Sequence, residues 1–323
     1  MKKFTGIFIF LLLINISVPF LYSKFYASFS VPTKEEISKE NIVVDDSVTL
    51  YDESAGKEIK VSLKDYLIGA TACEMPATYE ENALKAQMIA VHSYYLYCKD
   101  NPGYLEKEMI SVNSSKLKGF TDKTTLNGFW GTSYYDYYSK FERCYNEVKD
   151  IIVKYENKPA LTTYYAVSCG KTQTSENQWG ENIPYLISVD SNHDAVSENF
   201  LKLKELSESE MFSILKSNYP SIHLNEEEPE NWFGDIIYFD TGYAKFVTVG
   251  GDLVPADQFR NMLNLPSTCF MIFREDGKFS IATKGYGHGV GLSQFGANQL
   301  SQQGKDYRQI LSHYYPGTSI ENI

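Results

Sequence analysis

Residues 74–97, EMPATYEENALKAQMIAVHSYYLY, predict a long helix preceded by a single fixed carboxylate. Thr78 followed three places later by Glu81 is the pattern of a capping box, so the helix is expected to begin near Tyr79. An apolar face recurs at helical spacing and predicts packing against a core. Its members are Ala83, Leu84, Ala86, Ala90, Val91 and Tyr94.

Glu74 is the carboxylate ahead of this helix. Pro76 follows closely, and a proline disfavours the α conformation just before it, so Glu74 is expected on extended chain that leads into the helix. The N-terminus of a helix carries positive potential and holds an anion well. Glu74 is therefore a candidate functional carboxylate, and the alternative is an ordinary surface residue.

The composition excludes some classes of protein. The chain has 323 residues, 43% of them hydrophobic, which suffices for a buried core in one large domain or two small ones. The net charge of −11 argues against nucleic acid as a partner, because no basic stripe is available to neutralise phosphates. The 25 tyrosines have apolar faces and hydroxyl tips that suit sugar rings as well as core packing.

The first 45 residues are expected to target and tether the chain. Lys2 and Lys3 precede an apolar run, GIFIFLLLINISVPFLY, at residues 6–22. We expect residues 1–23 to form a membrane anchor (a signal-anchor transmembrane helix), with a cleaved signal peptide as the alternative. Polar residues 24–45 then form a linker. Residues 46–323 are expected to be extracytoplasmic, attached to the cell membrane by a single pass.

Cysteines and histidines give weak signals. The five cysteines contain no CxxC pair, and their odd number leaves at least one free or paired elsewhere. One or two disulfides, or free thiols throughout, are compatible with an exterior location. The five histidines lie far apart without an HxxxH pair, so no metal site is expected.

Residues 46–323 are expected to form one mixed α+β domain. Alternating patterns with short turns predict a strand pair at 46–66 and hairpins that turn at Thr241-Gly242 and Asp276-Gly277. The other expected elements are helices at 134–153, 196–218 (with a capping box at Ser207 and Glu210) and 257–263, a strand at 160–170, and a last helix from Ser293 to Gly304.

One possible chemistry is nucleophilic catalysis by a cysteine. Cys73 or Cys169 with His288 would supply the residue types of a cysteine hydrolase. Neither cysteine lies in a recognisable nucleophile turn, and the neighbouring carboxylate of Glu74 is expected to raise the pKa of Cys73.

The chemistry that fits better uses Glu74 alone on a glycosidic bond. Ordinary glycosidases need two carboxylates, but one suffices when the attacking hydroxyl belongs to the sugar itself. Muramic acid has such a group in its 6-hydroxyl, so one glutamate can protonate the leaving oxygen and then collect the hydroxyl proton. The apolar neighbours Met75 and Tyr79 are expected to raise the pKa of Glu74 for this role.

Several motifs in order along residues 60–320 resemble the stage II sporulation protein D family, which also contains the amidase enhancer LytB. The terminal blocks GYGHGVGLSQFGA and ILSHYYPGT are the most specific. The remaining blocks are EMP, ALKAQMIAVHSY, VSCGKT, NQWGENIPYL and FRNMLNLPSTCF.

The resemblance implies a membrane-anchored lytic transglycosylase that cuts peptidoglycan glycan strands, and so degrades cell wall, during engulfment of the forespore in sporulation. It also implies work beside a partner N-acetylmuramoyl-L-alanine amidase and a membrane partner of the engulfment machinery. The family's catalytic glutamate falls on Glu74. The rival reading, suggested by the enhancer branch, is a non-catalytic wall-binding module that activates the amidase.

The chain departs from the family pattern at three places. His92 stands where members usually carry an arginine, and the family's SGG turn is Ser168-Cys169-Gly170 here. Some members bind zinc between these blocks, but residues 113–145 contain only Cys144 and no histidine, so no zinc or other cofactor is expected. The residues expected to contact substrate are His92, Tyr164, Ser168, His288, Ser293 and Gln294. For Ser293 the alternative is the N-cap of the last helix, for His288 a turn residue, for Gln294 a helix-start residue, and for Tyr164 a buried strand residue.

Overall fold

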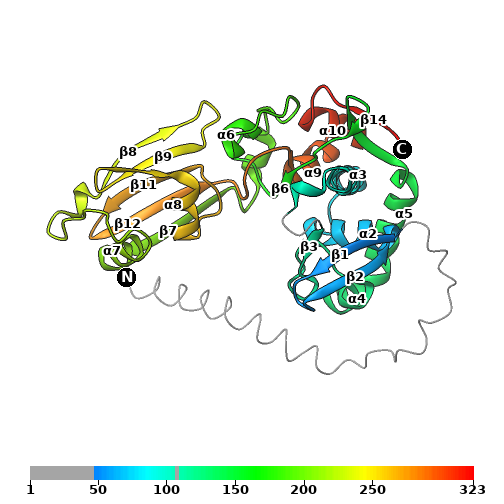
Figure 1. Ribbon diagram of the computed structural model, residues 1–323, viewed down its shortest axis with the longest axis horizontal. Coiled ribbons are helices and arrows are strands. Elements are labelled where there is room, and N and C mark those ends of the chain that lie inside the picture. The colour runs from blue at the N-terminus through cyan, green and yellow to red at the C-terminus, as the bar shows by residue number, and fades with distance from the viewer. Residues whose placement is uncertain (1–46, 106–108) are drawn as a thin grey trace.

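The computed structural model describes residues 47–105 and 109–323. The expected anchor at 1–23 and linker at 24–45 lie outside these residues. Figure 1 shows two lobes: a helical lobe of residues 47–200 and 286–323, and a sheet lobe of residues 201–285. Each lobe has its own cluster of buried hydrophobic side chains.

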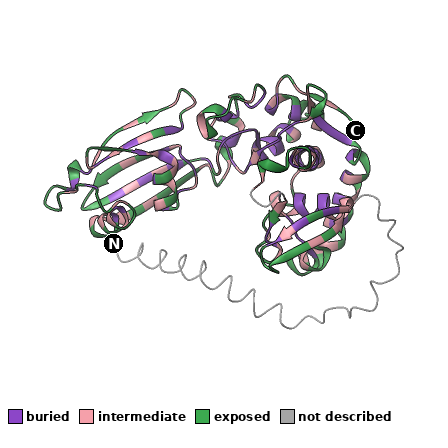
Figure 2. Ribbon diagram, viewed as in Figure 1, coloured by how far each residue is buried: buried purple, intermediate pink, exposed green. Residues whose placement is uncertain are grey.

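Helix α3 (Glu81–Asp100) is the centre of the helical lobe. Every residue from Ala83 to Ser93 is buried, so the helix is enclosed on all sides and not only along its apolar face, as Figure 2 shows. The elements around it are α2 (Leu63–Glu74), α5 (Tyr134–Val148), β4 (Ile151–Tyr155), α9 (Gln294–Gln302) and α10 (Tyr307–Tyr314).

Short sheets and helices complete the helical lobe. Strand β1 (Ser47–Asp52) pairs antiparallel with β2 (Lys57–Ser62) and parallel with β3 (Ile110–Val112). Strand β6 (Tyr164–Tyr165) pairs parallel with β13 (Leu292–Ser293), which joins segments far apart in the chain. The remaining elements are α4 (Lys123–Trp130), β5 (Lys158–Pro159), α6 (Ser175–Trp179) and β14 (Ser319–Asn322).

The sheet lobe contains two three-stranded antiparallel sheets, in the orders β10–β9–β8 and β11–β12–β7. Its core is largely aromatic: the Phe279 ring lies 5.1 Å from Phe233 and 5.5 Å from Trp232. The bounds are β7 (Leu201–Ser207), α7 (Glu208–Asn218), β8 (Phe233–Tyr238), β9 (Ala244–Val249), β10 (Asp252–Pro255), α8 (Ala256–Leu263), β11 (Phe270–Glu275) and β12 (Lys278–Lys284).

The mixed α+β class, the first strand pair and both hairpins are confirmed. The helix expected at 196–218 is wrong in its first half, because residues 201–207 are strand β7, which pairs along its length with β12. The capping box of Ser207 and Glu210 is formed and starts α7 directly after that strand. The strand expected at 160–170 is reduced to the two residues of β6.

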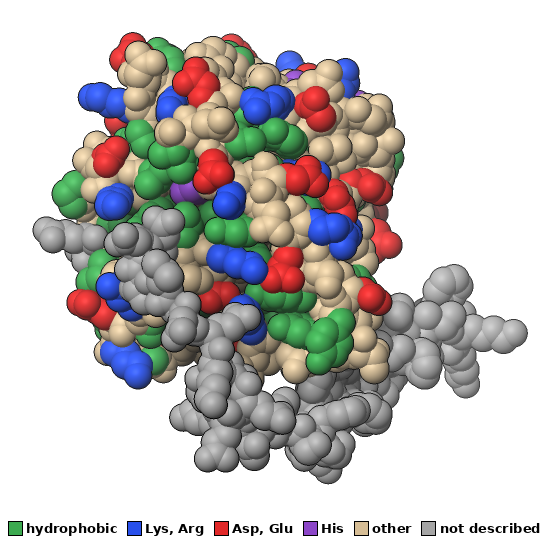
Figure 3. Space-filling model, turned by 90° about the vertical axis from the view of Figure 1, so that its right-hand side faces the viewer, with side chains coloured by type: hydrophobic (Ala, Val, Ile, Leu, Met, Phe, Trp, Pro, Cys, Tyr) green, Lys and Arg blue, Asp and Glu red, His purple; other side chains and the backbone are tan. Residues whose placement is uncertain are grey.

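The described surface of the helical lobe carries mixed charge. Figure 3 shows acidic and basic side chains interspersed with apolar ones over the face that it presents. Among the described residues on that face there is no broad basic area of the kind that binds a phosphate backbone. Within residues 47–105 and 109–323, no helix combines the length and the apolarity needed to cross a membrane.

Candidate functional site

Glu74 is the last residue of α2, whose N-cap is Ser62. The expectation that it lies on extended chain is therefore wrong. The restriction imposed by Pro76 acts on Met75, which is extended with φ −125° and ψ 139°, while Glu74 remains helical. The carboxylate thus lies at the carbonyl end of a helix, where negative potential disfavours its charged form.

The capping box expected at Thr78 and Glu81 is also wrong. Helix α3 begins at Glu81 with Glu80 as N-cap, and no side chain caps it. The Glu80 amide instead donates to Oδ1 of Asn298 in α9 at 2.8 Å. The turn between α2 and α3 is therefore tied to α9, which carries the next residue of the site.

Gln294, the first residue of α9, reaches Glu74 across 220 residues of sequence. Its Nε2 donates to Oε2 of Glu74 at 3.3 Å, and only 5% of Gln294 is exposed. Ser293 immediately before it is held in β13 beside Tyr165 of β6, so the pairing of these two strands sets the position of Gln294. Gln294, expected to contact substrate, therefore lies beside the candidate functional carboxylate.

The surroundings of Glu74 favour its protonated form. Burial raises the pKa of the half-buried Glu74 carboxyl, and the hydrogen bond from Gln294 opposes that rise. Tyr164 lies close enough for the Glu74 charge to act on it, and burial with that charge holds the pKa of Tyr164 well above its ordinary value. Burial, followed by the charge of Glu74, raises the pKa of Cys73 to about 12, which disfavours Cys73 as a nucleophile.

The His288 side chain contacts the backbone of Tyr164. Its Nε2 lies 3.1 Å from the Tyr164 carbonyl oxygen, and its Nδ1 accepts from the Val290 amide at 3.1 Å. This pattern assigns the proton to Nε2 of a neutral ring, because a carbonyl can only accept. Burial lowers the pKa of His288 to about 4, in agreement with a neutral ring. His288 therefore positions β6 and makes no bond to Glu74 in this arrangement.

The glycines around His288 allow a close approach of the backbone to neighbouring segments. A Cβ at Gly287, where φ is +120°, would come within 2.6 Å of Cβ of Tyr165.

Trp179, at the end of α6, is 44% exposed, and its ring centroid lies 5.3 Å from that of the His288 ring. Trp179 was missed as a site residue although it belongs to the NQWGENIPYL block, and its exposed ring suits stacking on a sugar.

Three of the expected substrate contacts are interior residues. His92 is 2% exposed within α3, and Ser168 and Ser293 are fully buried. The Ser168 hydroxyl donates to the Lys171 carbonyl at 2.9 Å. The Ser293 hydroxyl caps α9 by accepting from the Gly296 amide. These placements favour a supporting role in the fold over the expected contact with substrate, and the N-cap alternative for Ser293 is confirmed.

Asp194 is a buried carboxylate behind α9 that sequence reasoning missed. Its Oδ1 accepts from the Ser293 hydroxyl at 2.7 Å and its Oδ2 from the Ser191 hydroxyl at 2.6 Å. Burial raises the pKa of Asp194 from 3.8 to about 6, although both hydrogen bonds act against the rise. The sequence around it, SNHDAV, has no periodic pattern that would single out this position.

Asp194→Asn is expected to flatten the dependence of stability on pH. The folded protein binds the Asp194 proton more tightly than the unfolded chain does, so this group stabilises the fold below about pH 4. That stabilisation is lost as pH rises to about 6, by about 3 kcal/mol because one pKa unit corresponds to about 1.4 kcal/mol. Urea unfolding at pH 4, 5, 6 and 7 should show this decline in the wild type and a smaller one in Asp194→Asn. Asp235→Asn, at an exposed carboxylate of the sheet lobe, is the control; parallel curves for all three proteins would refute the assignment.

No group of three or more histidine, cysteine, aspartate or glutamate side chains in the described part of the chain is arranged to hold a metal ion. The described side chains at this site offer one half-buried carboxylate, an amide donor, phenol groups and an exposed indole.

Comparison with known proteins agrees with the motifs. A family model described as "SpoIID: Stage II sporulation protein" matches residues 51–155, which include Glu74. Stage II sporulation protein D of Bacillus amyloliquefaciens is 31% identical over 277 residues, or 85% of this chain and 78% of that protein. The protein of the same name from Bacillus subtilis is 29% identical over the same shares of the two chains.

A more distant relative is the amidase enhancer of Bacillus subtilis. It is 24% identical over 301 residues, which cover 79% of this chain and 40% of the enhancer. The identity to the Bacillus amyloliquefaciens protein, extending over most of both chains, establishes the relationship. This chain belongs to the stage II sporulation protein D family, which includes the amidase enhancer.

Proposed function

We propose that this chain is a peptidoglycan lytic transglycosylase in which Glu74 is first the general acid and then the general base. The observation that carries the proposal is a half-buried carboxyl whose pKa is raised by burial and whose Oε2 accepts from Gln294. A carboxyl that keeps its proton closer to neutral pH can donate it to a leaving oxygen. Membership of the stage II sporulation protein D family, whose resemblance implies cleavage of glycan strands, supports the choice of substrate.

The reaction needs one proton carrier. The Glu74 carboxylic acid donates its proton to the glycosidic oxygen while the bond from that oxygen to the anomeric carbon of muramic acid breaks. The Glu74 carboxylate then accepts the proton of the 6-hydroxyl of the same sugar, whose oxygen attacks the anomeric carbon. The products are a strand with a new free hydroxyl and a strand with a 1,6-anhydromuramyl end, and Glu74 regains its proton.

Two carboxylates near Glu74, one in sequence and one in the site, are engaged elsewhere, and Glu80 is exposed. Glu81 pairs with Arg143 at 2.8 Å and with Lys85 at 3.8 Å. Asp194 is fully buried and bonded to two serines. A mechanism with a second carboxylate as nucleophile or base therefore receives less support from the described residues than one in which the substrate hydroxyl attacks.

Product analysis tests the proposal directly. The purified protein is incubated with glycan strands stripped of their stem peptides, and the ends are identified by mass spectrometry. New 1,6-anhydro ends are expected. New reducing ends would show that water attacks instead, which would make the protein a hydrolase and refute the transglycosylase mechanism.

The second candidate function is a wall-binding module that activates a partner amidase. It is favoured by the relationship to a protein named amidase enhancer. The two functions differ in their dependence on Glu74. If the wild type and Glu74→Gln both fail to cut strands but accelerate an N-acetylmuramoyl-L-alanine amidase equally, the protein is an enhancer.

Gln294→Leu is expected to shift the pH dependence of strand cleavage. The Gln294 amide stabilises the charged form of Glu74, so its removal should raise the pKa of Glu74 further. Because the acid form is the reactive one, activity falls as pH rises through that pKa, and the falling limb should move to higher pH. Gln299→Leu, in the same helix with its amide bonded to Gln302, is the matched control. An unchanged limb in Gln294→Leu would contradict the role of this hydrogen bond.

The proposal includes a setting as well as a reaction. We infer a role in sporulation from the names of the two Bacillus relatives. The apolar run at 6–22 supports a membrane anchor with residues 46–323 outside the membrane. Recovery of the full-length protein in washed membranes, together with its digestion by protease added to intact protoplasts, would support this setting. Recovery in the soluble cytoplasmic fraction would contradict it.

A further inference from the structure

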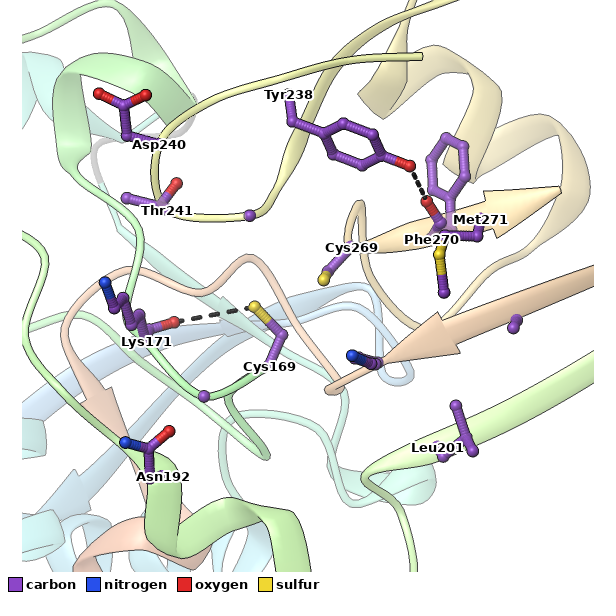
Figure 4. Close-up of a pocket in the computed structure, with 14 residues that line it drawn as sticks. Cys169, Lys171, Asn192, Leu201, Tyr238, Asp240, Thr241, Cys269, Phe270 and Met271 are labelled. Carbon is purple, nitrogen blue, oxygen red and sulfur yellow. Dashed lines mark hydrogen bonds between the residues drawn. The ribbon is translucent and has the colours of Figure 1, made fainter. Parts of the chain in front are cut away.

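Two cysteines face each other where the lobes meet. Cys169 lies in the turn after β6 in the helical lobe, and Cys269 directly precedes β11 in the sheet lobe. Each thiol lies close enough to act on the pKa of the other. Figure 4 shows both sulfur atoms at one pocket, with the Cys169 thiol directed to the Lys171 carbonyl oxygen at 3.9 Å.

The backbone holds the two cysteines at a short separation. The Lys284 amide donates to the Cys269 carbonyl at 2.8 Å. The next residue, Gly285, lies so close to the turn that a Cβ there would come within 3.0 Å of the Cys169 amide nitrogen. Consecutive residues of one chain segment therefore touch both cysteine backbones, and the proximity of the two cysteines is a consequence of the fold.

Both thiols are accessible to a small reagent. Cys169 and Cys269 are half-buried and line an open pocket of about 430 Å³. Lys171 and Lys284 line the same pocket, and positive charge there favours a thiolate. Cys98 and Cys144, in contrast, are buried in the helical lobe.

Cys169 is the more acidic of the pair. Hydrogen bonds from Cys269 and, to a lesser extent, from the Tyr243 hydroxyl lower the pKa of Cys169 to about 7 against the effect of burial. Burial raises the pKa of both Cys73 and Cys144 to about 12 and that of Cys98 to about 11. Because the thiolate is the attacking species in disulfide exchange, Cys169 is the expected point of first attack.

We propose that Cys169 and Cys269 are a reversible disulfide site that links the two lobes. In the first step the Cys169 thiolate attacks an external disulfide, forms a mixed disulfide and releases one thiolate of the reagent. In the second step Cys269 loses its proton and its sulfur attacks the Cys169 sulfur, which releases the second thiol. Two electrons pass from the two cysteines to the external disulfide, and the 168–171 turn becomes bonded to the start of β11.

The linkage would restrain the segment that carries Tyr164. The turn follows β6 directly, and Val167 is paired with Tyr286 through hydrogen bonds of 3.1 and 2.7 Å. A covalent bond at Cys169 therefore restrains the segment from Tyr164 to Cys169, which is already held at Val167 by Tyr286. The disulfide would close the loop from Cys169 to Cys269, and a loop of this length is expected to raise the midpoint of thermal unfolding by roughly 5–10 °C.

Peptide mapping of the full-length protein tests the proposal. The purified protein is incubated with oxidised glutathione at pH 8, remaining thiols are alkylated under denaturing conditions, and the digest is analysed by mass spectrometry. A peptide pair joined through Cys169 and Cys269 that dithiothreitol separates is the expected result. Alkylation of both cysteines, or glutathione retained on Cys169 with no bridge to Cys269, would overturn the proposal.

Variants connect the bond to the thermal shift. Cys169→Ser and Cys269→Ser should each abolish the rise of the unfolding midpoint after oxidation, while Cys73→Ser should keep it. A rise that persists in either of the first two variants would assign the effect to another pair. The mapping of the wild type does not depend on whether a variant folds.

Discussion

Glu74→Gln is expected to lower the rate of glycan-strand cleavage by about 10³-fold, within the usual range for loss of a general acid. The substitution replaces the carboxyl by an amide of the same shape, which cannot give its proton to a glycosidic oxygen. The amide oxygen can still accept the hydrogen bond that Gln294 makes at 3.3 Å. Formation of 1,6-anhydro ends over time is the measurement.

The fold of Glu74→Gln should be unchanged, because a half-buried carboxylate costs free energy that a neutral amide does not. Its unfolding midpoint in urea is therefore expected at or slightly above that of the wild type. Glu80→Gln, at an exposed carboxylate six residues later, serves as the matched control and should cleave at the wild-type rate. A Glu74→Gln protein that retains a tenth or more of the activity would exclude Glu74 as the proton donor.

Gly291→Ala is expected to destabilise the protein by about 4 kcal/mol, from backbone strain and overpacking together. Gly291 has φ +82°, and a Cβ there would lie 2.1 Å from the Thr163 carbonyl oxygen. That oxygen cannot easily move, because it accepts from the Leu292 amide at 3.1 Å and from the Tyr315 hydroxyl at 2.8 Å. Chemical denaturation gives the free energy of unfolding.

Gly304→Ala separates the two contributions. Gly304 has φ +87°, close to that of Gly291, but a Cβ there would meet nothing within 4 Å. Its substitution should therefore cost only the strain of the left-handed conformation, about 1 kcal/mol. Equal losses in the two variants would show that Thr163 yields to the added methyl group and that the contact between β6 and β13 is not tight.

Local chemistry allowed the short-range elements to be predicted. The Asp276-Gly277 turn and the Ser207–Glu210 capping box act over a few residues, and both are present. Strand β7 was missed because its pairing with β12 joins residues about seventy to eighty positions apart and outweighs the acidic, helix-like composition of the segment. The end of α2 was misjudged because Pro76 restricts only the residue directly before it.

Some residues of the candidate site were predictable, but its geometry was not. Glu74, Tyr164, His288 and Gln294 were identified from the motifs, yet no spacing rule shows that Gln294 reaches Glu74 while His288 bonds the Tyr164 carbonyl. Those contacts depend on the parallel pairing of β6 with β13, which is a long-range event. Asp194 could not be found from sequence, because its importance comes from burial behind α9.

The way the chain enters and leaves the sheet lobe has a consequence for evolution of the family. Phe200 precedes the lobe and Gly285 ends it, and the Gly285 amide donates to the Phe200 carbonyl at 2.7 Å. The two ends of the sheet lobe therefore lie side by side, and an inserted domain can be gained or lost where its two ends are adjacent. A turn of roughly two to five residues could bridge that point, so ancestral or distant members with a minimal, single-lobed architecture are sterically permissible.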